Sequence, residues 1–97
     1  MKIRDFIKMD IDIDVYDNVC DGIGIAYCGP MSLTEEGEKQ FAEVMDYDIE
    51  IQDDVAIVDI DRDNWRHMLR KAKDFFYSIA GYCDADLFDK WFVEVDR

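Results

Sequence analysis

The stretch DNWRHMLRKAKDFFYSIAGY, residues 63–82, decides the fold, because it is the longest run with a helical pattern. Its apolar side chains recur every three or four residues, which places them on one broad stripe of a helix. They are Trp65, Met68, Leu69, Ala72, Phe75, Phe76, Ile79 and Ala80. Asp61 or Asp63 can cap the first turn, and Gly81 stands where a left-handed cap is expected. We therefore expect a helix over 63–80, with a small sheet packed against it.

Length and charge limit what the rest of the chain can be. Ninety-seven residues predict a single domain over 1–97. The net charge is −13, from 24 acidic and 11 basic residues. Such a surface repels nucleic acid and anionic membranes and attracts basic proteins or cations. No run approaches the roughly 20 apolar residues that span a bilayer. Three cysteines without metal-ligand spacing indicate reduced thiols and a cytoplasmic location.

The N-terminal part predicts a hairpin. Residues 2–9 suit a short opening helix, and residues 10–16 alternate strictly between acidic and apolar side chains. One face of that strand would carry Ile11, Ile13 and Val15, and the other would carry aspartates. Turn-forming residues follow, and residues 22–28 predict the returning strand, which Gly29-Pro30 ends.

Residues 34–92 add helices and two more strands. A helix is expected over 34–45, with Ser32 or Thr34 as its cap and Gly37 on its apolar stripe. That glycine suggests close approach to the sheet. Strands follow at 47–52 and 55–60, joined by a tight polar pair; the second is nearly continuously apolar, which favours an interior position. After the helix of 63–80, a last helix is expected over 84–92. The order (α)ββαββαα predicts an α+β fold, with about four antiparallel strands and helices on one face. The strand order stays open.

Two groups of aspartates are weak metal candidates, since carboxylate oxygens bind calcium and magnesium. The six residues are Asp10, Asp12, Asp14, Asp59, Asp61 and Asp63. Counted as a calcium loop from Asp10, the sixth position is Val15 where glycine is needed; counted from Asp59, the twelfth is the repulsive Arg70. A solvated strand face explains the first group of aspartates without a metal, and helix capping explains the second. We therefore expect no metal and no cofactor.

No set of residues indicates catalysis. His67 is the only histidine, and it could pair with Asp63 or Lys71 one turn away, but no nucleophile is placed beside it. Cys83 precedes a helix whose N-terminus could lower its pKa, although a small buried side chain is the commoner case. We therefore predict that the protein is not an enzyme.

One helix face is basic. Arg66, Arg70 and Lys73 share a face of the 63–80 helix, with Arg62 and Lys71 nearby. In so acidic a protein, the simplest interpretation is internal balance, by pairing with the acidic region or the last helix. A specific anion site is the alternative.

The acidic side chains themselves are the leading candidate for a functional surface. Residues 32–54 carry one basic and nine acidic side chains, spread over a helix, a strand and a turn. Duplex DNA shows one charge per ~1.7 Å of axis, and a rigid acidic face can imitate that array. Ordinary solubility is the competing explanation. The candidate partner-binding residues are Glu35, Glu36, Glu38, Glu43, Asp46, Asp48, Glu50, Asp53 and Asp54.

Three segments carry a resemblance in overall texture: KMDIDIDVYDNV (8–19), LTEEGEKQFAEV (33–44) and AGYCDADLFDKWF (80–92). They resemble short acidic proteins of gut-bacterial mobile elements and prophages, which implies the cytoplasm of a bacterial host cell. In size and charge the chain is also similar to anti-CRISPR and other DNA-mimicking inhibitors. This likeness is at the level of a class and supplies no site residue.

We therefore expect a non-enzymatic interaction protein that occupies a basic surface of a partner, for instance a nucleic-acid-handling enzyme. The alternative is a small accessory or divalent-cation-binding module. The aromatics Phe88, Trp91 and Phe92 exceed what a small core easily hides, so a homodimer contact there is a further expectation.

Overall fold

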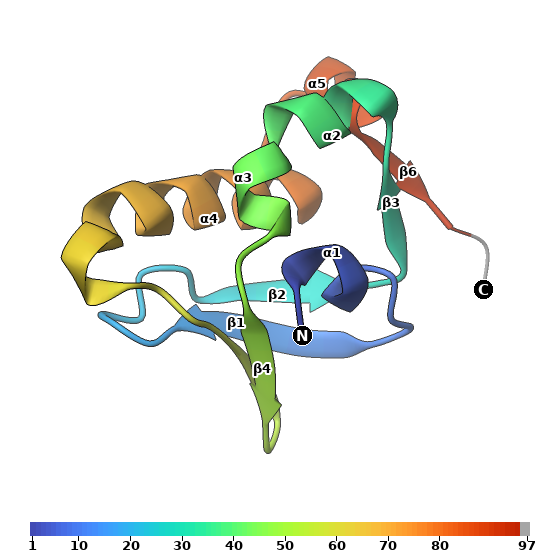
Figure 1. The fold of residues 1–97 in the computed structure, drawn as a ribbon. Coiled ribbons are helices and arrows are strands. Elements are labelled where there is room, and N and C mark those ends of the chain that lie inside the picture. Colours follow the sequence, from blue (N-terminus) through green and yellow to red (C-terminus); the bar gives the residue numbers. More distant parts are fainter. Residues whose placement is uncertain (96–97) are drawn as a thin grey trace.

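The long helix forms as its pattern predicts. In the computed structural model, which describes residues 1–95, helix α4 spans Trp65–Ile79 and lies over the main sheet (Figure 1). A 3-10 turn, η1 (Arg62–Asn64), precedes it, and Asp61 Oδ1 accepts a hydrogen bond from the amide of Asp63 at 3.0 Å. The expected cap is therefore shifted: Asp61 caps the 3-10 turn that leads into the helix, while α4 itself begins after Asn64 without a hydrogen bond from a capping side chain.

Gly81 ends the helix in the conformation that glycine favours. Its φ is +96°, and its amide donates to the carbonyl of Ser78 at 3.0 Å. The amide of Tyr82 reaches back to the carbonyl of Tyr77 at 2.9 Å. These two bonds form a Schellman motif, which satisfies carbonyls that the helix would otherwise leave without partners.

The main sheet is mixed, which corrects the all-antiparallel expectation. Its strands are β1 (Asp12–Asp17), β2 (Ile25–Cys28), β4 (Ile49–Gln52) and β5 (Val55–Val58), in the order β2-β1-β5-β4. The two hairpins β1–β2 and β4–β5 are antiparallel as predicted, but β1 and β5 are parallel. The chain between the hairpins returns β5 alongside β1 in the same direction. The interior position of β5 follows its apolar sequence, as expected.

Helices cover one face of this sheet. Val15 aligns with Ile25 on one side and Ala56 on the other, and all three are buried. Phe76 of α4 meets the buried ring of Tyr27 with centroids 6.5 Å apart. Figure 1 shows α4 and α3 (Ala42–Met45) on the same side of β1 and β2. The alternation of 10–16 is therefore confirmed: its apolar side chains face the helices and its aspartates face away.

The predicted helix over 34–45 is divided into two. It forms α2 (Glu35–Gln40) and α3, separated by Phe41, whose φ and ψ are −115° and 24°. Phe41 is buried, with its ring 5.2 Å from that of Phe75 and 5.7 Å from that of Phe92. The break turns this aromatic side chain into the core. Thr34 caps α2 as predicted, accepting from the amide of Gly37 at 3.1 Å.

A second, two-stranded sheet was not expected from the sequence. β3 (Met31–Leu33) pairs with β6 (Phe92–Glu94), which directly follows α5 (Ala85–Trp91). This pairing brings α5 against α2. A Cβ on Gly37 would lie 2.1 Å from the carbonyl oxygen of Trp91. The expectation that Gly37 approaches the sheet is therefore wrong, because the close contact is with the end of α5.

The chain start closes one edge of the main sheet. Residues before α1 (Ile3–Phe6) run beside β4: the amide of Ile49 donates to the carbonyl of Met1 at 2.8 Å, and Ile3 donates to Tyr47 at 2.9 Å. These bonds use backbone groups that an edge strand would otherwise expose.

The aromatics proposed as a dimer contact are mostly absorbed by the core. Phe92 is only 3% exposed, and Phe88 and Trp91 are half-buried. The core therefore hides Phe92 but leaves Phe88 and Trp91 partly exposed, and dimerisation stays an untested expectation. Within residues 1–95, no helix combines the length and apolar character needed to cross a membrane.

Candidate functional site: an acidic sheet face

The main sheet has a second face, away from the helices, and its side chains follow from the strand register. One row across the sheet holds Ala26, Asp14, Val55 and Gln52. The next holds Tyr16, Ile57 and Glu50. Further rows at the two ends carry Asp12 on one side and the pair Asp48 and Asp59 on the other. We call these residues the acidic sheet face: Asp12, Asp14, Tyr16, Asp48, Glu50, Val55, Ile57 and Asp59.

This face combines an apolar centre with acidic surroundings. Tyr16, Val55 and Ile57 are partly buried, while the five carboxylates are exposed. None of the four strands contains a lysine or an arginine. In the part of the chain that the structure describes, no helix lies over this face (Figure 1). Two shallow hollows, of about 440 and 410 Å³, open on it.

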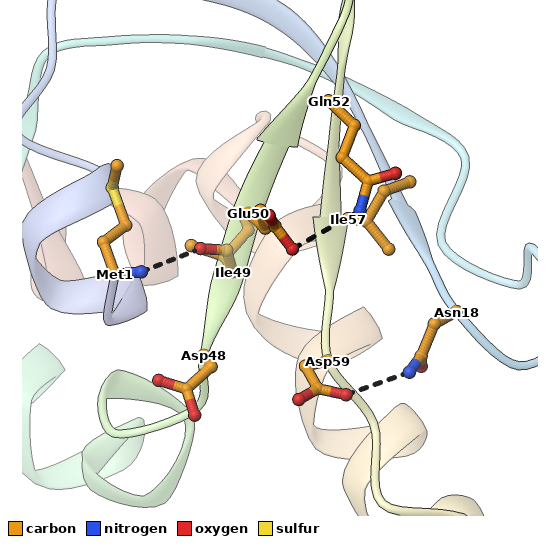
Figure 2. A pocket seen from close by; sticks show the side chains of 8 residues that line it. All are labelled: Met1, Asn18, Asp48, Ile49, Glu50, Gln52, Ile57 and Asp59. Carbon is orange, nitrogen blue, oxygen red and sulfur yellow. Dashed lines mark hydrogen bonds between the residues drawn. The ribbon is translucent and has the colours of Figure 1, made fainter.

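The larger hollow is acidic on both sides (Figure 2). Asp48 and Asp59 occupy opposite positions, just before β4 and just after β5, where the amide of Asp59 donates to the carbonyl of Asp48 at 2.9 Å. Lys2 Nζ lies 3.1 Å from Asp48, and Asn18 Nδ2 donates to Asp59 at 2.9 Å. Like charges in directly opposite positions disfavour strand pairing. Lys2 and Asn18 therefore offset part of the repulsion between Asp48 and Asp59, and the rest of that repulsion remains.

A buried carboxylate holds the loop beside this face. Asp17, at the end of β1, is 2% exposed and accepts hydrogen bonds from the amides of Val19, Cys20 and Ile23. Burial raises the pKa of Asp17, but those backbone hydrogen bonds lower it by more, so the pKa lies below its ordinary value. The charged carboxylate of Asp17 therefore holds the loop between β1 and β2 in place. Asp17 is one of the turn-forming residues after the predicted strand of 10–16, and the sequence pattern does not predict its burial.

The nine acidic residues expected between 35 and 54 do not form one surface. Glu35, Glu36 and Glu38 lie on α2, while Asp53 and Asp54 form the β4–β5 turn at the other end of the molecule (Figure 1). Lys39 pairs with Glu35 at 3.8 Å, and Lys90 pairs with Glu36 at 3.3 Å. Of the nine, only Asp48 and Glu50 belong to the acidic sheet face.

Glu43 and Asp46 lie between these regions and face other elements. Asp46 pairs with Arg4 of α1 at 3.2 Å. Glu43 accepts from the hydroxyl of Tyr47 and lies 2.8 Å from His67 Nε2, across the α3–α4 contact. The pKa of Glu43 is lowered, first by the Tyr47 hydrogen bond and then by that from His67. Burial and Glu43 together raise the pKa of Tyr47. The predicted partners of His67, Asp63 and Lys71, are thus replaced by Glu43.

The aspartates that were weak metal candidates do not converge. Asp61 caps the 3-10 turn, and Asp59 accepts from Asn18. Asp12 and Asp14 alternate along an extended strand. Among residues 1–95, no three histidine, cysteine, aspartate or glutamate side chains gather where they could hold a metal ion.

The structure bears on two further interpretations. Burial and the neighbouring Asp84 raise the pKa of Cys83, whose thiol also donates to the carbonyl of Ser78 at 3.6 Å, and this goes against the alternative of an activated thiol. The basic residues of α4 were expected to pair with the acidic region. Within residues 1–95, Arg62, Arg66, Arg70 and Lys73 form no ion pair, and only Lys71 lies near enough to Glu43 to lower its pKa.

Comparison of the chain with protein-family models, with curated proteins and with solved structures found no match. Any functional argument therefore depends on the surfaces of this molecule.

Proposed function

We propose that this protein acts by binding, and that the acidic sheet face docks on a basic surface of a partner protein. The observation that carries the proposal is the face itself. It is a sheet surface without lysine or arginine in its four strands, and in the described residues no helix covers it. Protein interfaces commonly combine a partly apolar centre with a polar rim, and Tyr16 and Ile57 supply such a centre here.

The strands make this array rigid. Alternate residues on a strand are about 7 Å apart and neighbouring strands about 4.8 Å. Asp14 sits on β1, between Ala26 of β2 and Val55 of β5, and Glu50 sits on the next strand. Carboxylates held this way cost less backbone freedom on binding than those on a flexible tail. A basic protein surface that normally binds nucleic acid is the class of partner that we propose, because regularly spaced negative charge is what it recognises.

An inhibition assay tests this function. Labelled duplex DNA is titrated with a panel of basic bacterial nucleases, including a CRISPR effector, with and without the protein. We expect weakened DNA binding for at least one nuclease and a salt-sensitive complex between the two proteins. Undiminished DNA binding across the panel, with no complex formed, would overturn the proposal.

A further inference from the structure

One flank of helix α4, beside its buried stripe, carries a second surface of opposite charge. Arg62, Arg66, Arg70 and Lys73 recur at the helical period and form one stripe. The helix rise of 1.5 Å per residue spreads Arg66 to Lys73 over about 10 Å. Among residues 1–95 none of these four cations pairs with a carboxylate. These cations are therefore not held in ion pairs, in a chain whose net charge is −13.

An apolar groove runs beside the stripe. Trp65 and Leu69 line a hollow of about 280 Å³ together with Arg66, Arg70, Lys73 and Asp74. The guanidinium of Arg66 lies 5.3 Å from the centre of the Trp65 ring, and the ammonium of Lys73 lies 5.9 Å from that of Tyr77. Aromatic faces hold these cations by cation–π attraction, which leaves their N–H donors available to an anion.

We propose that this stripe and groove bind an acidic segment of a protein partner, whose carboxylates meet the arginines and whose apolar side chain packs beside Trp65. Charge complementarity supports this occupant, because arginines that form no ion pair and lie next to an aromatic side chain are well suited to bind a carboxylate-bearing segment. α4 packs on the opposite face of the sheet from the acidic sheet face, so the two surfaces are separate. This inference does not rest on the function proposed above.

The flanking charges favour a short peptide over nucleic acid. Asp61 and Asp63 lie at the beginning of the stripe, and Asp74 lines the groove itself. A nucleic acid strand longer than the stripe would bring its phosphates against these carboxylates. A peptide needs only a few carboxylates in register with the cations, and it can place an apolar side chain between them.

Fluorescence anisotropy of a labelled peptide tests the inference. The probe is a synthetic peptide with one leucine flanked by glutamates, compared with the same peptide carrying glutamines and with a short oligothymidine. The proteins are wild type, Arg66→Glu/Arg70→Glu, and the matched control Lys39→Glu/Lys90→Glu, which changes the net charge equally on α2 and α5. Circular dichroism checks that each variant folds, and Arg66→Gln/Arg70→Gln replaces the reversal variant if it does not.

We expect the glutamate peptide to bind wild type in a salt-sensitive manner and the glutamine peptide not to bind. The Arg66→Glu/Arg70→Glu variant should bind about tenfold or more weakly, while the control keeps most of the affinity. The inference is overturned if the glutamate peptide does not bind wild type at low salt, or if the control loses as much affinity. Tighter binding of oligothymidine through the same arginines would overturn it in favour of a nucleic acid site.

Discussion

Asp48 and Asp59 occupy directly opposite positions, just before β4 and just after β5, with both carboxylates on the acidic sheet face (Figure 2). Lys2 contacts the first and Asn18 the second, so the two like charges are only partly compensated. A sequence under selection for stability alone has little reason to place acids there. We interpret this repulsion as a cost of the binding function that we propose for the face.

Replacing Asp59 with asparagine should therefore stabilise the fold. The substitution removes one of the two facing charges, while the new side-chain oxygen can still accept from Asn18. We expect the free energy of unfolding in urea to rise by about 0.2–1 kcal/mol at low salt. The gain should shrink as salt screens the wild-type repulsion. A loss of stability, or a gain that is unchanged by salt, would contradict this interpretation.

Asp17 should be far more sensitive to the same change. Its buried carboxylate accepts hydrogen bonds from three backbone amides, and an asparagine would direct an NH₂ group at one of these donors. We expect Asp17→Asn to lower the free energy of unfolding by about 1–3 kcal/mol. Asp21→Asn is the matched control in the same loop, since Asp21 is exposed at φ +56°, where asparagine is well tolerated. Equal effects of the two substitutions would show that the Asp17 hydrogen bonds do not hold the loop.

Glu43 should give the α3–α4 contact a pH dependence. Because its pKa is lower in the folded protein, its contribution to stability is present above the ordinary glutamate pKa, about 4.3. That contribution is lost as the pH falls through the lower folded value. The difference in melting temperature between wild type and Glu43→Gln should thus be largest near neutral pH. It should disappear below pH ~4. A gap that widens on acidification would contradict the assigned sign.

Gly37 should tolerate no side chain. A methyl group there would overlap the carbonyl oxygen of Trp91, which belongs to the backbone and cannot rotate away. We expect Gly37→Ala to destabilise the protein by about 1–3 kcal/mol despite its better helix propensity. Gln40→Ala, at an exposed position of the same helix, should change stability by less than about 0.5 kcal/mol. Stabilisation by Gly37→Ala would show that α2 and α5 do not approach as closely as described.

The local patterns in the sequence were sufficient for most elements. Alternation predicted β1, helical periodicity predicted α4, and Gly81 predicted its end, because each depends on neighbours along the chain. The parallel β1–β5 pair, the β3–β6 sheet and the break at Phe41 depend on contacts between distant segments. No local pattern specifies those contacts.

The candidate site likewise depends partly on local sequence patterns and partly on contacts between distant segments. The acidic residues between 35 and 54 are close together in the sequence. Those on α2 and those at the β4–β5 hairpin nevertheless lie at opposite ends of the molecule. Asp14 and Glu50 come to lie on one face, on either side of β5, only through the order of the strands. Similarly, the pairing of His67 with Glu43 requires α3 to pack on α4. Charge counts along the chain therefore predicted an acidic surface, and only the topology places it on the sheet.

The central claim is that the acidic sheet face, and not acidity in general, binds a basic partner. Displacement of duplex DNA from a basic nuclease tests it most directly, with wild type, Asp14→Lys/Glu50→Lys and Glu35→Lys/Glu38→Lys compared side by side. Both double variants change the net charge equally, but only the first alters the sheet face. We predict that it loses inhibition by about tenfold or more while the α2 variant keeps it. Equal losses, or a greater loss from the α2 variant, would contradict the account.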